Sequence, residues 1–243
     1  MKREKWGMTV VCAALALVVA SCGKEAEPSP AALSTALNPR QAPDYYVDQA
    51  NKYFDNLDTR FDPSIVPNYS ALVARWEWPP WLWLTGYERD QMIKTTQMAL
   101  LLDPSTVPTR DCRAFSAQPF ARCVVSFQYA GGPCPIYEEF TFNDQGEMTF
   151  IEAWSDLPGM LPNADPKDRW AQGRDVHRLS TKLPGLGNAS GLIDLDAVWM
   201  KEAKRRDPEI ENFVMRANDF WTYWMQAFQE AEPDSWARGC GWI

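Results

Sequence analysis

Two glutamates in a predicted β-hairpin are the residues best suited to acid–base chemistry. The segment "PIYEEFTFNDQGEMTFIEAW" alternates as two strands on either side of Asn143–Gly146, which fits a type I turn with glycine in the left-handed position. This turn places Glu138 opposite Glu152 on one face of the hairpin. Two facing carboxylates in a partly dry site raise each other's pKa, which keeps an acid protonated near neutral pH. The alternative is that the face ends here and both side chains are solvated.

The residue content argues against other forms of catalysis. His177 is the only histidine and no CxxC pattern is present, which argues against a zinc site and a His-dependent triad. We therefore expect no metal and no cofactor. His177 lies among Arg174, Arg178 and Lys182, a set typical of a solvated basic patch.

The second chemical feature is a cluster of tryptophans. The stretch "VARWEWPPWLWLTG" places four indoles within eight residues, around Pro79–Pro80. Core packing accounts for some of them, but each buried indole N–H needs an acceptor, and a pocket for a flat apolar molecule accounts for the rest. The hairpin aromatics Phe140 and Phe150 are predicted to lie opposite each other on the same apolar face. The predicted ligand-binding residues are Trp76, Trp78, Trp81, Trp83, Phe140, Phe150 and Trp154.

The elements that must position these residues follow from periodicity. Helical spacing begins after Pro43, and a second helix runs through "ERDQMIKTTQMALLL". Strand patterns fill residues 107–154, and residues 157–193 form an irregular Pro/Gly-rich connection. Residues 194–243 form a helical extension, with a broad apolar stripe after Asp207–Pro208 that predicts packing on the rest of the fold.

This order of elements resembles the ketosteroid-isomerase-like cone fold, also called the nuclear-transport-factor-two-like or SnoaL-like superfamily, over residues 44–156. The resemblance implies an α+β fold in which a cone-shaped, curved antiparallel sheet packs on helices. In such isomerases a first-helix tyrosine and a protonated strand acid stabilise the oxyanion. "NKYFDNL" places Tyr53, and "EEFTFN" places Glu138, at these positions, with Glu152 as a further candidate. The family's carboxylate base falls in "WEWPP", where Trp78 takes its place and Glu77 is expected to face the opposite side.

Four cysteines are available for disulfides after the N-terminal region. An even number in an oxidising compartment predicts two disulfides, with three possible connectivities. We favour Cys112–Cys123 across a hairpin that turns at Ser116–Pro119, and Cys134–Cys240 between the sheet and the C-terminal region.

The first residues indicate export. Lys2, Arg3 and Lys5 precede an apolar run over residues 8–20, which is typical of a secretory signal peptide. The stretch "VASC", ending at Cys22, resembles a bacterial lipobox. The resemblance implies removal of residues 1–21, acylation of Cys22 and a flexible tether over residues 22–43. Gly23 favours the outer membrane, facing the periplasm, over the inner membrane.

The charge of the chain restricts its partners. The net charge is −8, and it becomes −10 without residues 1–21, which carry three basic groups and one acidic group. Nucleic acid is therefore not an expected partner. The expected partners are an apolar small molecule, the lipid bilayer through Cys22, and an envelope protein.

Three functions fit these observations. The first is a lipid-anchored envelope protein that binds an apolar small molecule without turning it over. The second is an isomerase or dehydratase acting beside a carbonyl, with Tyr53 and Glu138 as oxyanion donors. The third is an envelope scaffold that docks a protein partner through the C-terminal helices. Loss of the carboxylate base to Trp78 favours the first over the second.

Overall fold

The computed structural model describes residues 38–78, 86–102, 104–155, 161–165, 167–172, 177–183, 186, 192–219 and 222. Several predictions lie outside these residues: acylation of Cys22, the tether up to residue 37, the positions of Trp81 and Trp83, and the pairing of Cys240. Within the described ranges, no helix is long and apolar enough to cross a membrane.

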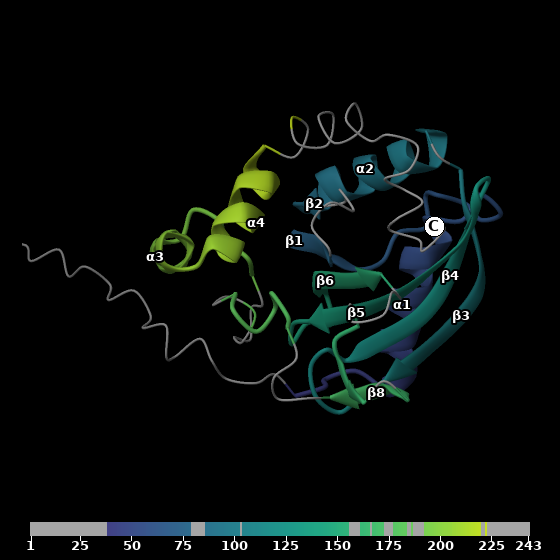
Figure 1. The fold of residues 1–243 in the computed structure, drawn as a ribbon, viewed down its shortest axis with the longest axis horizontal. Helices are drawn as coiled ribbons and strands as arrows, with labels where there is room; N and C mark the ends of the chain where they lie inside the picture. The colour runs from purple at the N-terminus through teal and green to yellow at the C-terminus, as the bar shows by residue number, and fades with distance from the viewer. Residues whose placement is uncertain are drawn as a thin grey trace, which may run out of the picture.

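A curved sheet of six strands forms the centre of the fold (Figure 1). The strand order is β2-β1-β6-β5-β4-β3, and every neighbouring pair is antiparallel except β1 and β6, which are parallel. The predicted α+β class with a curved sheet is confirmed, and the parallel pair is the one departure from an antiparallel sheet. The strands are β1 Tyr69–Trp78, β2 Gly86–Tyr87, β3 Thr106–Ala114, β4 Ala121–Tyr129, β5 Gly132–Phe142 and β6 Met148–Ser155.

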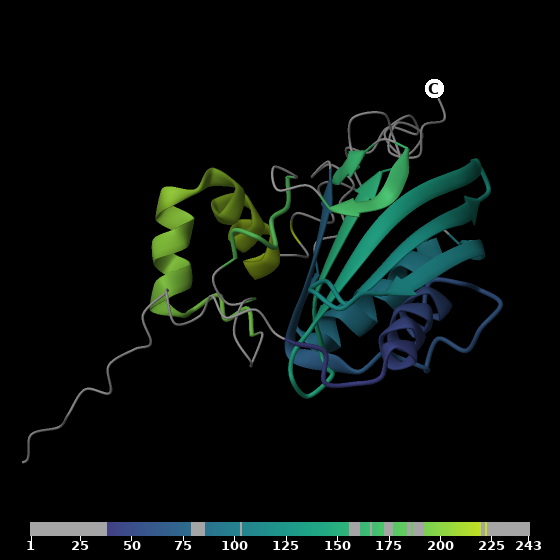
Figure 2. The same cartoon turned by 90° about the horizontal axis from the view of Figure 1, so that it is seen from below.

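Helices cover one face of this sheet, and later parts of the chain cover the other. Figure 2 shows α1 and α2 together on one side, and a small hairpin of β7 and β8 on the opposite side, with α3 and α4 near the β1 end. We call the side of α1 and α2 the helix face and the opposite side the outer face. The bounds are α1 Pro43–Asp55, α2 Arg89–Leu102, β7 Asn163–Asp165, β8 Asp168–Gln172, α3 Val198–Arg206 and α4 Pro208–Asn218.

Local sequence explains where the helices begin. Pro43 occupies the first turn of α1, where its fixed φ suits a helix and its missing N–H costs no hydrogen bond. Asp207 caps α4 by accepting a hydrogen bond from the Glu209 N–H, and Pro208 follows it. These starts agree with the predicted helices.

Apart from β3, most of the sheet is buried on both faces, and the described residues form a hydrophobic core on each side. On the helix face, Tyr46 and Phe54 of α1 pack on strand residues such as Phe140. On the outer face, Phe213 of α4 packs on strand residues, and the Leu179, Leu183 and Ile193 side chains belong to the same core. The Phe213 ring centroid lies 5.9 Å from that of Trp76 and 6.2 Å from that of Phe150. Residues 177–183 and 192–219 therefore belong to the same folded body as the sheet.

The β5–β6 hairpin has the predicted turn but a different register. Gly146 has a φ of 79° and its N–H donates to the Asn143 carbonyl at 3.0 Å. Next to the turn, however, the ladder skips Thr149, which forms a β-bulge. Beyond the bulge Glu138 pairs with Ala153, so the predicted pairing with Glu152 is wrong.

This one-residue shift separates residues that were expected to share a face. Glu152 pairs with Glu139 instead, and Phe150 pairs with Thr141. Because side chains alternate along a strand, Glu138 and Phe140 face the helices, whereas Glu152 and Phe150 face outward.

The predicted disulfide between Cys112 and Cys123 is confirmed. The two residues pair directly across β3 and β4, with their Cα atoms 4.1 Å apart. Cys134 is also disulfide-bonded. Its predicted partner, Cys240, lies outside the described residues.

Candidate active site

A buried arginine on the helix face gathers three groups that can take part in proton transfer. Arg75 of β1 donates from Nε to the Tyr53 hydroxyl at 2.7 Å, and from Nη2 to Glu138 Oε1 at 3.3 Å. Its Nη1 donates to Glu77 Oε1. All four side chains are buried and come from α1, β1 and β5. The tyrosine and both glutamates therefore meet at one guanidinium.

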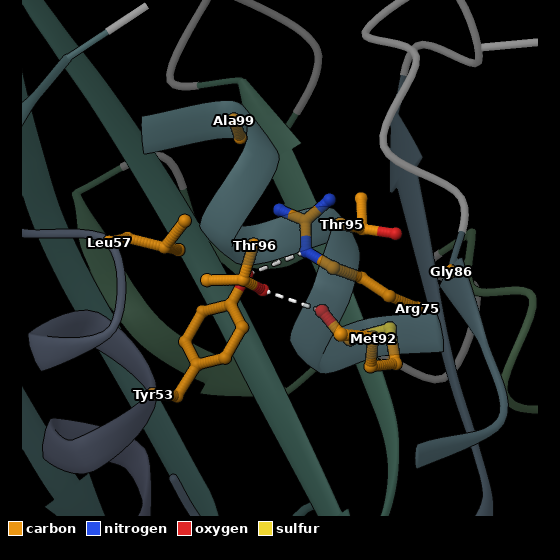
Figure 3. Close-up of a pocket in the computed structure, with 8 residues that line it drawn as sticks. All are labelled: Tyr53, Leu57, Arg75, Gly86, Met92, Thr95, Thr96 and Ala99. Atoms are coloured by element: carbon orange, nitrogen blue, oxygen red, sulfur yellow. Dashed lines mark hydrogen bonds between the residues drawn. The ribbon is translucent and has the colours of Figure 1, made fainter. Parts of the chain in front are cut away.

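Two members of this cluster line a small cavity between α1, α2 and the β1–β2 pair. Figure 3 shows Arg75 extending from β1 toward α2, close to the Tyr53 hydroxyl. The cavity volume is about 20 Å³, which is room for about one water molecule. This space suits the polar end of a ligand and not a whole flat apolar molecule. The residues lining it are Tyr53, Leu57, Arg75, Gly86, Met92, Thr95, Thr96 and Ala99.

Burial raises the pKa of both Glu138 and Tyr53, so each keeps its proton to a higher pH than it would in water. Burial raises the pKa of Glu138 to about 7, and the nearby Glu77 charge adds to the effect, while Arg75 and a hydrogen bond with Tyr53 oppose it. Glu138 Oε2 has no hydrogen-bond partner among the described residues. Burial also raises the pKa of Tyr53 well above its ordinary value, so its hydroxyl stays a donor. Glu138 is thus poised to exchange a proton near neutral pH.

Glu77 occupies the inward position that was predicted for Trp78. Glu77 pairs with Ala153 and Trp78 with Trp154, so alternation directs Glu77 to the helix face and Trp78 to the outer face. The prediction that Trp78 replaces the base inside the cone, with Glu77 facing away, is therefore wrong. The prediction failed because β1 directs the polar side chains of Arg75 and Glu77 toward the helices, and the indoles of Trp76 and Trp78 toward the outer face.

The outer face holds Glu152 in a different role. Its Oε1 accepts from Trp78 Nε1 at 2.7 Å and from the Leu179 N–H at 2.6 Å, and its Oε2 accepts from the Ser180 N–H at 3.1 Å. Burial raises the pKa of Glu152 to about 7 against these three hydrogen bonds. Glu152 therefore fastens the segment of residues 177–183 to the sheet, on the opposite face from Tyr53 and Glu138.

The predicted ligand-binding residues are divided between the two faces. Trp76, Trp78, Phe150 and Trp154 lie on the outer face, by the register of β1 and β6. Phe140 lies on the helix face, with its ring 5.3 Å from that of Tyr53. The structure does not bring the five described members of the set together in one pocket.

Sequence reasoning did not identify Arg75 or the buried pair of Arg178 and Glu139. Arg178 donates to both carboxylate oxygens of Glu139, at 2.7 and 2.8 Å, and is buried instead of solvated as predicted. His177 is half exposed and lies 3.0 Å from a Glu209 carboxylate oxygen. The available signal was the Arg-x-Glu spacing of Arg75 and Glu77, which puts both on one strand face.

Comparison with known proteins yields similar folds only. No protein-family model and no curated protein matches the sequence. A de novo designed protein with a curved β-sheet is 14% identical, with a TM-score of 0.37, over 48% of this chain and 88% of that chain. An NTF2-like protein of unknown function from Cytophaga hutchinsonii is 9% identical, with a TM-score of 0.36, over 46% of this chain and 89% of that one. A SnoaL-like protein of unknown function from Burkholderia thailandensis is 12% identical, with a TM-score of 0.34, over 48% of this chain and all (100%) of that one.

Proposed function

We propose that this protein is an acid–base enzyme of the isomerase or dehydratase type, acting beside the carbonyl group of a small molecule. The observation that carries the proposal is the convergence of Tyr53, Glu77 and Glu138 on Arg75 beside a cavity. The inward position of Glu77 supplies the carboxylate that the sequence had appeared to lack. Trp76 and Trp78 face outward and pack with residues of the 177–219 part of the chain. This removes the main support for an apolar ligand in a Trp-lined pocket.

Each group has a distinct role in the proposed reaction. The Glu77 carboxylate removes a proton from the carbon next to the carbonyl, the C–H electron pair forms the new C=C bond, and the carbonyl oxygen takes the negative charge. Arg75 and Tyr53, which both line the cavity, stabilise that oxyanion in a buried site. Glu138 stays protonated beside Tyr53, so it adds no negative charge next to the oxyanion. Return of the proton from Glu77 to a different carbon completes an isomerisation. In a dehydration the enolate electrons form the Cα=Cβ bond, the C–O bond to the β-hydroxyl breaks, and the hydroxyl takes the proton held by Glu77 and leaves as water.

The first step, common to both reactions, can be measured directly. Small β,γ-unsaturated ketones and β-hydroxy ketones in D₂O are the probes, and exchange of the α-hydrogen is followed by proton NMR. Removal of a general base lowers the rate by roughly 10²–10⁴-fold, which is the loss expected for Glu77→Gln. Tyr53→Phe should also lower the rate.

A matched control lies on the same helix. Tyr45 donates from its hydroxyl to the Gly146 carbonyl at 2.8 Å, away from the cavity, so Tyr45→Phe should exchange like the wild type. If Glu77→Gln retains the wild-type rate, or if no probe exchanges faster than in buffer, the proposal is wrong.

We also propose that the enzyme is exported and held at the outer membrane by acylated Cys22, facing the periplasm. The basic residues Lys2, Arg3 and Lys5, the apolar run and the small residues before Cys22 support this. Cys22→Ala should move the protein from the membrane fraction to the soluble periplasmic fraction and abolish palmitate labelling. Cys12→Ala, within the signal peptide, is the control and should leave both unchanged.

A further inference from the structure

A row of four charged residues crosses the outer face of the sheet. In register, Arg113 of β3 pairs with Arg122 of β4, Arg122 pairs with Glu139 of β5, and Glu139 pairs with Glu152 of β6. Three members have hydrogen-bond partners. Arg113 donates to Asp111 at 2.9 Å, Glu139 accepts from Arg178, and Glu152 accepts from backbone N–H groups. Arg122 is the exception.

Arg122 is a buried cation without an acceptor. Its side chain is only 3% exposed, and its Nε has no hydrogen-bond partner in the described part of the chain. Burial lowers the pKa of Arg122 and the Arg178 charge adds to this effect, while Glu139 and Tyr137 oppose it. A buried guanidinium N–H without an acceptor is costly, because it loses its hydration and forms no hydrogen bond in its place.

The neighbouring carboxylate attracts Arg122 electrostatically, but its hydrogen bonds go to other residues. Both oxygens of Glu139 accept hydrogen bonds from Arg178, and one also accepts from the Tyr137 hydroxyl at 2.8 Å. Two buried guanidiniums therefore share one carboxylate among the described residues. Glu152, the next residue of the row, also raises the pKa of Arg178 through its charge, but among the described residues no carboxylate hydrogen-bonds Arg122.

One aromatic ring, that of Phe115, stacks on the Arg122 guanidinium, and further rings follow it. The Arg122 Cζ atom lies 3.8 Å from the centroid of Phe115. The Phe115 ring is 5.9 Å from that of Trp170 on β8, which is 6.2 Å from that of Tyr137. A ring stacked on one face of a guanidinium leaves its N–H groups free to bond an anion in the guanidinium plane.

We propose that Arg122 is the anchor of a second binding site, on the outer face of the sheet, for the oxyanion group of a small molecule. The group is a carboxylate or a phosphate, since both accept two parallel hydrogen bonds from a guanidinium. The bound anion supplies the acceptor that the buried Arg122 Nε–H lacks among the described residues. This site is separate from the cavity at Tyr53, which lies on the opposite face.

Thermal unfolding of the mature protein in different anions tests the proposal. The probes are acetate and inorganic phosphate, compared with chloride at the same pH and ionic strength. The anion that binds should raise the Tm of the wild type by about 2–4 °C above its value in chloride. A response to acetate identifies a carboxylate site, and a response to phosphate alone identifies a phosphate site.

Substitutions at Arg122 and at Arg113 test whether the rise in Tm arises from anion binding at Arg122. Arg122→Met should abolish the response and should raise the Tm in chloride, because it removes an unpaired buried charge. Arg113→Met, in the same row but exposed, should respond like the wild type. Arg122→Lys keeps the charge but lacks the planar guanidinium, so it should bind the anion at least about tenfold more weakly. If Arg122→Met does not fold, Arg122→Lys takes its place in the test.

Two results would overturn the proposal. One is a wild-type Tm that rises no more in acetate or phosphate than in chloride, which leaves only a general salt effect. The other is an unchanged anion response in Arg122→Met, or in Arg122→Lys where that variant replaces it.

Discussion

Two glutamates with similarly raised pKa values have very different neighbours. Glu138 has one carboxylate oxygen without a hydrogen-bond partner among the described residues and lies beside Arg75 and Tyr53. Glu152 uses both oxygens to accept three N–H bonds. A raised pKa at a buried carboxyl therefore does not by itself identify an acid catalyst. The hydrogen-bond partners show whether the carboxyl is free to exchange a proton.

These two pKa values predict an unusual pH dependence of stability. Below about pH 4.5 both carboxyls are protonated in the folded and unfolded chain. Between pH 4.5 and 7 only the unfolded chain loses these protons, because the folded pKa of Glu138 and of Glu152 is about 7. The free energy of unfolding should therefore fall as the pH rises through this window, by up to about 3 kcal/mol for each group, and then level off.

Urea unfolding at intervals from pH 4.5 to 8 measures this dependence. Glu138→Gln, which keeps the shape without the charge, should flatten part of the slope and be more stable than the wild type at pH 8. A wild-type stability that increases from pH 5 to 7 contradicts the raised pKa values.

Arg75 gives the second prediction at the residue scale. Removing one partner of a buried ion pair leaves the other charge uncompensated, so Arg75→Met should cost about 3–5 kcal/mol at pH 8. The cost should be smaller at pH 5, where Glu138 is protonated. Arg113→Met, which removes an exposed ion pair, should cost far less than Arg75→Met, and an equal cost for the two variants would contradict the central role of Arg75.

At the scale of elements, Gly86 controls the approach of α2 to the β1–β2 pair. A Cβ atom at this position would lie 2.1 Å from the sulfur of Met92, which lines the same cavity. Gly86→Ala should therefore push Met92 into the cavity, cost about 1–3 kcal/mol and reduce α-hydrogen exchange.

A double-variant cycle checks this cause. In the background of Met92→Ala the clash is absent, so adding Gly86→Ala should cost much less than it does in the wild type. Purely additive costs in thermal unfolding would show that the two residues do not compete for the same space.

The same scale shows what the sequence could predict. The helix starts, the Asn143–Gly146 turn and the Cys112–Cys123 pairing follow from local chemistry and were predicted correctly. The faces of β1 and β6 were not, because β6 is buried along its whole length and offers no contrast between polar and apolar sides. With no such contrast, the extra residue at Thr149 could not be detected, and one extra residue reverses every face beyond it.

At the scale of the whole molecule, the C-terminal segment is needed to complete the outer face. A chain ending at Ser155 would expose Trp76 and Phe150, and each such side chain contributes about 1.5–3 kcal/mol when buried. Glu152 would lose two of its three hydrogen-bond donors, and Glu139 would lose Arg178. We expect this truncated chain to aggregate or to lack a fixed tertiary structure.

Size-exclusion chromatography and near-UV circular dichroism measure this outcome. A chain starting at Ala42 and continuing to Ile243 is the control, and it should be a folded species with native near-UV signals. A folded monomer from the shorter chain would show that the outer face does not need its cover.

The parallel pairing of β1 with β6 also has a consequence for the order of events during synthesis. Trp76 pairs with Glu152, seventy-six positions later, so β1 leaves the ribosome long before its main partner exists. The hairpins from β3 to β6 can form between near neighbours, whereas β1 must wait for the last strand of the sheet. β2 can pair with one edge of β1 early, but the edge that pairs with β6 stays open until then, and such an edge on a strand carrying Trp76 and Trp78 is prone to aggregate. We therefore expect the nascent chain to depend on a chaperone until β6 has been made.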